Sequence, residues 1–459
     1  MTPLSSHRLG VFASACLGIL LLMPTAMWSQ VDTNAAEVDT SPGDEVAMQA
    51  PPPVSGIAYA TAFTSETDKM ESNYLRGGLT ITGAYSSNVS GSTTPVGGAS
   101  YSLWPTLALD KNTSRAHYLF SCSPGFTFYP HTSSLNQANL NAAFAWQYRL
   151  SPNMTVSLNE AFQKTSNIFN QPDPLSGTVV SGSAPAPGQA IVPPAADQVT
   201  NSATAQITYQ LDANSMIGAG GTFASLRFPN PVEVPGLFSS NSAAGSAFYS
   251  HRLLDKYYIG ATYQYQNIDS YQAGTQNIAN THIQTQTIFF FLSIYLKPAL
   301  SLSVSAGPQR FTATQWPLPG TQSWSPLMMA SIGWRGGRTS LSASYARIVT
   351  AAGGLNGAYQ SNTASASARW QMTRTWSAGI SASYALYNTL TPSFSQTTPG
   401  GHTLSGTASV GHPLGEHIRA QAGYSWVQQN YGGPAAISNL PNTNFTFVSI
   451  SYQFARPLQ

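Results

Sequence analysis

The chain has 459 residues, of which 8% are charged and 42% are hydrophobic, whereas a soluble domain carries about 25% charged residues. No segment after residue 30 reaches the roughly 18 uninterrupted apolar residues of a membrane-spanning helix, so a helical membrane bundle is excluded. A charge-rich disordered chain is excluded by the low charge. What remains is a polar, charge-poor β-protein with 11% aromatic residues.

The N-terminus has the order of a secretory signal. His7 and Arg8 precede an apolar run at 11–23, and the small residues Thr25 and Ala26 follow it. A basic start, an apolar centre and a small-residue end are the three parts of an export signal. Residues 1–30 are therefore predicted to be a signal peptide.

The next segment, residues 31–74, is acidic. It holds eight acidic residues and one basic residue, Lys69, for a net charge of −7, whereas residues 75–459 carry a net charge of +8. Few large apolar residues and a run of three prolines at 51–53 accompany the acids. Such a composition cannot build a core, so we predict a flexible periplasmic arm.

From residue 75 onward, apolar and polar residues alternate with period two. Tyr118, Phe120 and Phe126 alternate with polar residues such as His117 and Thr127. The same division recurs at 138–150, 300–309, 375–387 and 417–428. A period of two indicates strands whose two faces meet different surroundings.

Short and long connections between these segments also alternate. Short polar turns fall near residues 111–112, 151–153, 212–214, 254–255, 297–298, 336–337, 372–373 and 414–415. Longer Gly-, Pro-, Ser- and Asn-rich loops fall at 87–99, 131–136, 167–197, 229–241, 269–281, 312–323, 351–358, 388–401 and 429–442. Eight turns and nine loops predict 18 strands, with a range of about 16 to 20.

These features predict an all-β fold, a transmembrane antiparallel up-and-down β-barrel over residues 75–459. Closure is expected because an open sheet edge would leave unpaired backbone groups in hydrocarbon. A soluble β-propeller, whose blades also recur at about 40 residues, needs four short strands per interval, whereas each interval here holds two long ones. An even strand number places both ends of the barrel on one side, the periplasm in bacterial barrels.

The last predicted strand contains Phe445, Phe447, Val448, Ile450, Tyr452 and Phe454. This alternating, aromatic-ended segment resembles the C-terminal signature of outer-membrane proteins, which implies recognition by the barrel-assembly machinery and a place in a Gram-negative-type outer membrane. Residues 75–454 resemble bacterial porin-like barrels. Ser-rich strands joined by turns such as Leu150-Ser151-Pro152-Asn153 look most like the barrels that accompany surface-polysaccharide export.

No catalytic site is predicted. The nine acids after residue 75 lie mostly at turns or in long loops, and the histidines are scattered. Serines occupy nearly every polar face, so chance proximity of Ser and His carries no signal. The chain is therefore predicted not to be an enzyme, and no cofactor, metal or nucleic-acid partner is expected.

A basic girdle is the one candidate site. Six arginines lie within about five residues of a short turn and share the parity of the polar face of their strands: Arg115, Arg149, Arg252, Arg335, Arg369 and Arg419. They are expected either to line one mouth of the lumen and favour anions, or to reach lipid phosphates and turn acids. Glu160 has the parity of the apolar face, which predicts a bulge after Leu158 or a failure of the strand assignment there.

The function expected from these features is an outer-membrane channel that passes polar or mildly anionic solutes by diffusion. One alternative is a conduit for surface polysaccharide. Another is a barrel without transport that serves adhesion or scaffolding through its loops. The expected partners are outer-membrane lipid and a polar solute or polysaccharide, and the oligomeric state stays open.

Overall fold

The computed structural model describes residues 73–91, 94–166, 197–230, 237–254, 256–272, 281–297, 299–315, 319–351, 354–390, 400–432 and 442–458. The predicted signal peptide and nearly all of the predicted acidic arm lie outside these residues. Eighteen strands are present, with one short 3-10 helix, Ser133–Leu135. The strands are β1 (Tyr74–Ser86), β2 (Gly98–Asn112), β3 (Ala116–Phe128), β4 (Gln137–Ser151), β5 (Met154–Thr165), β6 (Gln198–Gln210), β7 (Ser215–Arg227), β8 (Ser239–Leu254), β9 (Tyr257–Tyr271), β10 (Thr281–Lys297), β11 (Leu300–Gln315), β12 (Thr321–Arg335), β13 (Thr339–Thr350), β14 (Tyr359–Gln371), β15 (Ser377–Thr389), β16 (Gly401–Pro413), β17 (Ile418–Tyr431) and β18 (Thr443–Pro457).

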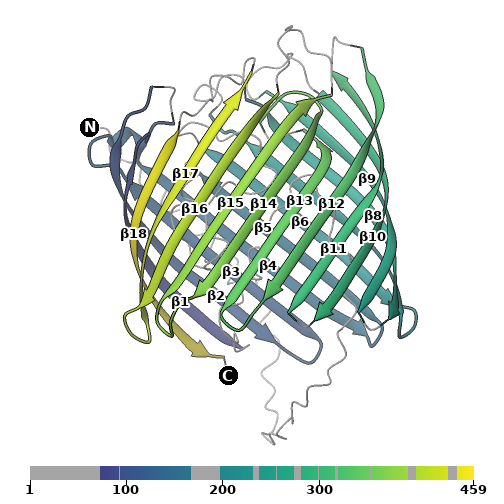
Figure 1. The fold of residues 1–459 in the computed structure, drawn as a ribbon, viewed down its shortest axis with the longest axis horizontal. Coiled ribbons are helices and arrows are strands. Elements are labelled where there is room, and N and C mark those ends of the chain that lie inside the picture. Colours follow the sequence, from purple (N-terminus) through teal and green to yellow (C-terminus); the bar gives the residue numbers. More distant parts are fainter. Residues whose placement is uncertain are drawn as a thin grey trace, which may run out of the picture. The chain divides into compact units, whose positions relative to one another are not determined.

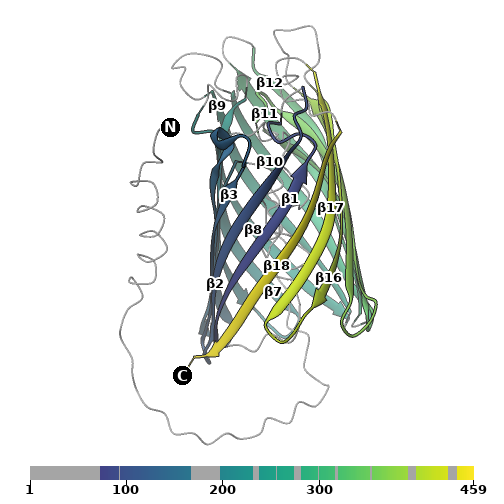
Figure 2. The ribbon, with the colours of Figure 1, turned by 90° about the vertical axis from the view of Figure 1, so that its left-hand side faces the viewer.

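Each strand pairs antiparallel with its neighbours in sequence, and the sheet closes because β1 also pairs with β18. The closing ladder runs from Tyr74 opposite Pro457 to Ser86 opposite Phe445. The strands cross the barrel at a slant (Figure 1), and β18, β1 and β2 lie side by side (Figure 2). The predicted closed barrel and its strand number of 18 are confirmed.

The two ends of the barrel differ in their connections. Eight connections, such as Ser151 to Met154 between β4 and β5, are short, whereas the nine at the other end are mostly longer. We call these the turn end and the loop end. β1 begins and β18 ends at the turn end, because Tyr74 pairs with Pro457 and Asp110 there.

The outer and inner faces of the strands have opposite chemistry. On β10, Ile288 and Phe290 are 50% and 65% exposed on the outer face, and Thr287, directly before Ile288, is buried on the inner face. Serine pairs connect neighbouring strands along the inner wall, for example Ser342 with Ser367 and Ser383 with Ser405, each with hydroxyl oxygens 2.6 Å apart. The period-two alternation in the sequence therefore follows the pleat of the strands.

Strands at the loop end are longer than the sequence analysis predicted. The predicted loops at 269–281 and 312–323 shrink, because β9 runs to Tyr271, β11 runs to Gln315 and β12 begins at Thr321. The outer face there carries polar side chains, among them Asp269 and His282, whose Oδ1 and Nδ1 atoms are 2.6 Å apart. On the inner face at this level the neighbouring residues are apolar, among them Ile268 and Ile283. The alternation of apolar outer and polar inner residues is therefore reversed before these strands end.

The prediction for Glu160 was wrong. The register of β5 with β4 and β6 continues without a shift from Thr155 to Lys164, and Glu160 lies opposite Phe144 and Ala203. Glu160 is exposed on the outer face, next to Leu158 and Phe162 on the same face of its strand. Among the described residues, no helix is long and apolar enough to span a membrane.

Candidate pore constriction

The wall of the barrel has a seam between β12 and β13 at the loop end. β12 begins at Thr321, yet its ladder with β13 extends only from Met328 opposite Arg347 to Arg335 opposite Ser340. On its other side β13 stays paired with β14 up to Thr350 opposite Tyr359. Pro326, two residues beyond the last β12–β13 pair, has no N–H and suits a strand edge. The seam leaves residues 321–327 of β12 as an edge.

Beyond the seam, the loop-end part of the β13–β14 hairpin turns into the barrel. We call residues 348–351 and 354–360 the inner tip. The N–H of Val349 donates to Oε1 of Gln309 at 3.0 Å, and Nε2 of Gln360 donates to Oγ of Ser325 at 2.8 Å. Gln309 and Ser325 lie on the inner face of β11 and β12, opposite each other in the ladder. The inner tip therefore lies against the inside of the wall.

One face of the inner tip packs on the wall. Val349, Ala351 and Ala358 form a buried apolar cluster with four inward side chains of β9, β10 and β11: Ile268, Ile283, Phe311 and Ala313. Burial of a side chain the size of valine stabilises a fold by about 1.5–3 kcal/mol. Oγ1 of Thr281 adds a hydrogen bond of 2.6 Å to Oδ1 of Asn356.

The other face of the inner tip spans the interior. Leu355 and Tyr359 of the tip form a second buried cluster with Leu226 and Phe228 at the end of β7, with Leu237 before β8, and with Tyr387 of β15 and Tyr431 of β17. β7 and β17 lie on nearly opposite walls in the strand order. The N–H of Phe238 also donates to the carbonyl of Gly354 at 2.9 Å. An apolar bridge thus crosses the barrel near its loop end.

The turn of the tip depends on glycine. Gly354 and Gly357 have φ angles of 105° and 117°, a region that favours glycine. At the base of the tip, Nη2 of Arg347 donates to Oε1 of Gln360 at 2.9 Å, while the Nε atom of Arg347 is buried without a hydrogen-bond partner. The sequence predicts a loop at 351–358 but not its inward course. Pro326 within a strand, and the apolar Leu355 in the predicted loop, were the available signals.

The structure places five of the six predicted arginines on the inner parity of the strands near the turn end. Arg149 lies opposite Thr155, Arg252 opposite Tyr258, and Arg419 opposite Ser451. Arg335 and Arg369 both lie opposite Ser340, on its two sides, which brings them within two strands of each other. The sixth, Arg115, lies in the turn before β3, and its carbonyl accepts a hydrogen bond from the N–H of Arg149 at 2.8 Å.

Arg76 is a further arginine at this level that the sequence analysis missed. It lies opposite Ala108 and Ala455 on the inner parity of β1, and its guanidinium lies 5.9 Å from the ring centroid of Tyr74. It follows the start of β1 and not a turn, so a search around turns passes over it. We call Arg76 and the five arginines on the inner parity, Arg149, Arg252, Arg335, Arg369 and Arg419, the arginine ring.

Hydrogen bonds hold two members of the arginine ring in place. Nη2 of Arg419 donates to Oγ of Ser377 at 3.0 Å, and Nε of Arg252 donates to Oδ1 of Asn214 at 3.1 Å. In the same turn, the N–H of Asn214 donates to Asp212 at 2.7 Å, which lowers the pKa of that carboxyl below its usual value. The ring therefore extends around the mouth from β1 to β17, and hydrogen bonds hold the side chains of Arg252 and Arg419.

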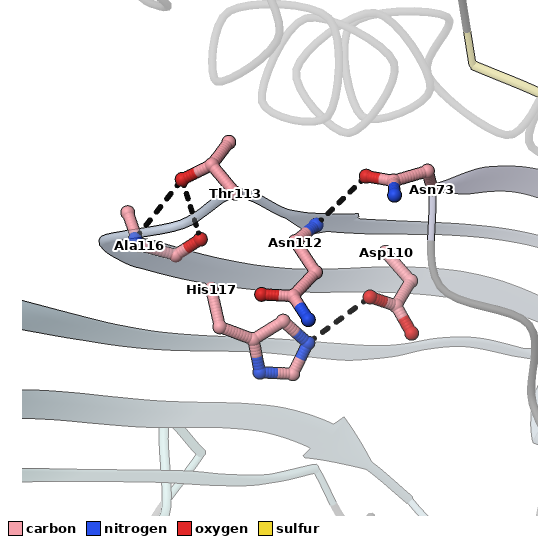
Figure 3. Close-up of polar contacts among 6 residues, drawn as sticks. All are labelled: Asn73, Asp110, Asn112, Thr113, Ala116 and His117. Carbon is pink, nitrogen blue, oxygen red and sulfur yellow. Dashed lines mark hydrogen bonds and ion pairs between the residues drawn. The ribbon is translucent and has the colours of Figure 1, made fainter. Parts of the chain in front are cut away.

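A polar cluster at the turn end joins β1, β2 and β3 (Figure 3). Nε2 of His117 lies 3.0 Å from Oδ1 of Asp110, and the N–H of Asn112 donates to Oδ1 of Asn73 at 2.9 Å. Asn73 has a φ of 69° and its carbonyl accepts the N–H of Leu458 at 2.7 Å. These bonds fix the point at which residue 73 enters the barrel, beside the arginine ring.

Comparisons with known proteins give structural likeness without sequence relatives. No protein-family model matches the chain, and no curated protein matches it in sequence. Solved structures that resemble it include the siderophore receptor PiuA from Acinetobacter baumannii, with 11% identity and a TM-score of 0.39 over 81% of this chain and 69% of that one. OccK2 (OpdF) from Pseudomonas aeruginosa has 11% identity and a TM-score of 0.40, over 83% of this chain and 98% of that one. The outer membrane protein OpdK of the same organism has 8% identity and a TM-score of 0.36, over 83% and 99%.

No centre for metal chemistry emerges in the part of the chain that the structure describes. There, no group of three or more His, Cys, Asp or Glu side chains is placed to hold a metal ion. The pairs His117–Asp110 and His282–Asp269 lie at opposite ends of the barrel, so they do not form one site.

Proposed function

We propose that the protein is an outer-membrane channel for small polar or mildly anionic solutes. The observation that carries this proposal is the closed barrel, apolar outside and lined by Ser, Thr and Gln inside, because only a membrane explains an exposed apolar outer face around a polar interior. Phe290 at 65% exposed and Thr287 at 2% exposed on one strand illustrate the contrast. The turn end faces the periplasm in this proposal.

The arginine ring supports a preference for anions. Six guanidinium groups around one mouth raise the local concentration of anions, and rings of Arg are a means by which pores select anions. In the mouth, Asp110 is an acid on the same inner parity, and its carboxylate lies 3.0 Å from His117. The balance of charge on the mouth is therefore positive.

Conductance in planar lipid bilayers tests the proposal. Purified, folded protein is expected to form channels, and a salt gradient across the bilayer should give a reversal potential of the sign set by anion passage. Fractionation of cells should place the protein in the outer membrane, with heat-modifiable mobility on gels. A protein that inserts into the bilayer and conducts no ions would overturn the channel.

A conduit for surface polysaccharide is a second candidate, favoured by the hydroxyl-rich inner wall. The cross-strand pairs Ser342–Ser367 and Ser344–Ser365, with oxygens 2.6 Å and 2.7 Å apart, offer a neutral hydrogen-bonding surface. Inhibition of ion conductance by long sugar polymers, and not by short sugars, would favour the conduit. A barrel for adhesion or scaffolding would show no conductance. In all three cases the barrel acts without catalysis and is inserted by the barrel-assembly machinery.

A further inference from the structure

We propose, building on the channel function, that the inner tip is a displaceable gate with a second position in the wall, paired to the free edge of β12. In the structure, the tip lies inside and the apolar bridge crosses the interior. In the second position, β13 continues its ladder along residues 321–327 and the bridge is broken.

The register of the existing ladder specifies the second position. Continuing from Met328 opposite Arg347 places Leu327 opposite Ile348, Ser325 opposite Thr350 and Trp324 opposite Ala351. Ile348 and Thr350 then have the parity of the inward Ser342 and Ser344, and Val349 and Ala351 have the parity of the outward Leu341 and Tyr345. Trp324, 66% exposed on the outer face, would lie beside Ala351. The alternation of β13 therefore fits the wall as well as the interior.

The second position would exchange one set of contacts for another. Hydrogen bonds of Val349, Asn356, Gln360 and Gly354 connect the inner tip to β10, β11, β12 and the segment before β8, whereas the bond from the N–H of Leu390 to the carbonyl of Ala358 at 2.8 Å continues the β14–β15 ladder. Moving outward exchanges the first set, and the apolar contacts of Val349, Ala351 and Ala358, for backbone ladder bonds to β12. Pro326 cannot give a ladder bond to Val349, because it has no N–H. The free edge is therefore a weaker partner than a complete strand, which allows the inner position to compete.

The hinge lies at the end of the β12–β13 ladder. Arg347 is the last paired residue, and its buried Nε has no partner in the inner position. An unsatisfied buried donor is costly, so the inner position carries a defect at its base. On the other side, β15 pairs with β16 only as far as Tyr387 opposite Gly401, so the loop-end parts of β13, β14 and β15 can move together.

Disulfide locking tests the gate in protein that lacks the predicted signal peptide, and with it Cys16, and in which Cys122 is replaced by Ser. The pair Thr281→Cys with Asn356→Cys joins side chains that are in contact in the inner position. The pair Ser325→Cys with Thr350→Cys joins residues that become opposite in the second position. Oxidation is expected to abolish conductance in the first variant and to hold the channel open in the second, and reduction should return both to the behaviour of the Cys122→Ser parent.

The pair Ser293→Cys with Ser303→Cys is the matched control. Its hydroxyls are 3.2 Å apart on paired strands of the wall, so its disulfide should leave conductance unchanged. If the Cys122→Ser parent conducts and the oxidised Thr281–Asn356 variant conducts equally with its disulfide formed, the proposed gate is contradicted while the proposed channel function is supported. Failure of the Ser325–Thr350 disulfide to form in a conducting protein also overturns the gate. If the parent and every reduced variant insert but none conducts, the channel function itself fails.

Discussion

The side chain of Gln309 on β11 accepts a hydrogen bond from the N–H of Val349 on β13, although β12 lies between these strands in the sheet. A contact that skips one strand is possible only because β13 leaves the wall and passes inside β12. Beyond the seam, the side chain of Gln309 therefore accepts the hydrogen bond that a backbone carbonyl of β12 would accept from Val349 in a continuous ladder.

Replacing Gln309 with Ala should destabilise the barrel. The buried N–H of Val349 would lose its acceptor, which costs about 1–3 kcal/mol. Urea unfolding of the protein folded in lipid vesicles measures the loss. Gln421→Ala, on the inner face of β17 near the turn end, is the control and should stay within about 0.5 kcal/mol. Equal losses at both positions would contradict the role given to Gln309.

Neighbouring residues of β15 should respond oppositely to the same charge. Ile380 is 58% exposed on the outer face, and Ser381 lies on the inner face opposite Ser367 and Thr407. Ile380→Arg should lower the free energy of unfolding by about 2–4 kcal/mol at the depth of the bilayer midplane and by less towards an interface. Ser381→Arg should fold and shift the reversal potential towards anions. The assignment of the two faces fails if both variants lose the same stability.

The arginine ring should set ion preference. Changing Arg149, Arg369 and Arg419 together to Gln removes three positive charges from one mouth and should shift the reversal potential towards cations, most strongly at low salt. A matched variant changes Lys111, Arg338 and Arg374, of which Lys111 has the outer parity and the other two lie in turns. An equal shift of the reversal potential in the matched variant would mean that the total charge of the protein, and not the arginine ring, sets the ion preference.

The acidic arm is proposed to act on the same mouth. Residues 31–74 carry a net charge of −7, and Asn73 is held beside the ring by hydrogen bonds. Tethering the acidic residues there gives them a high effective concentration at the mouth. Deleting residues 31–70 should raise single-channel conductance at low salt, and the difference should shrink as salt shortens the Debye length from about 8 Å at physiological ionic strength. The triple arginine variant should mimic the deletion. Identical conductance of full-length and deleted protein at low salt would leave the arm as a simple tether.

The sequence predicted the barrel well because two bulk phases act on every strand. Ile380 and Ser381 illustrate this, since each side chain follows the solvent on its own face. The prediction of strands stopped where this contrast is reversed. Asp269 and His282 lie on strands but were predicted to lie in a loop, since polar side chains face outward there and the apolar Ile268 and Ile283 face inward. Glu160 breaks the contrast locally without moving the backbone, which local sequence rules do not foresee.

The constriction could not be predicted, because it depends on contacts between strands that are not sequence neighbours. Leu226 and Tyr431 join one cluster across the barrel, and nothing in either segment encodes the other. Pro326 gave a local sign that one ladder would end, but not that the released hairpin would turn inward. Five of the arginines could be placed by parity, whereas Arg76 required the position of β1 relative to β18.

The ladder between β1 and β18 continues past Phe454 to Arg456 and Pro457, opposite Leu75 and Tyr74. These two strands are the most distant pair in sequence that must meet, so their encounter has the largest loop-closure cost of any ladder in the barrel. Hairpins such as β4–β5 can form as soon as their own residues are available. The pairing of β18 with β1 therefore determines when the sheet closes into a barrel. Until then the sheet is open, and its two edge strands have unpaired backbone groups that can pair with other chains.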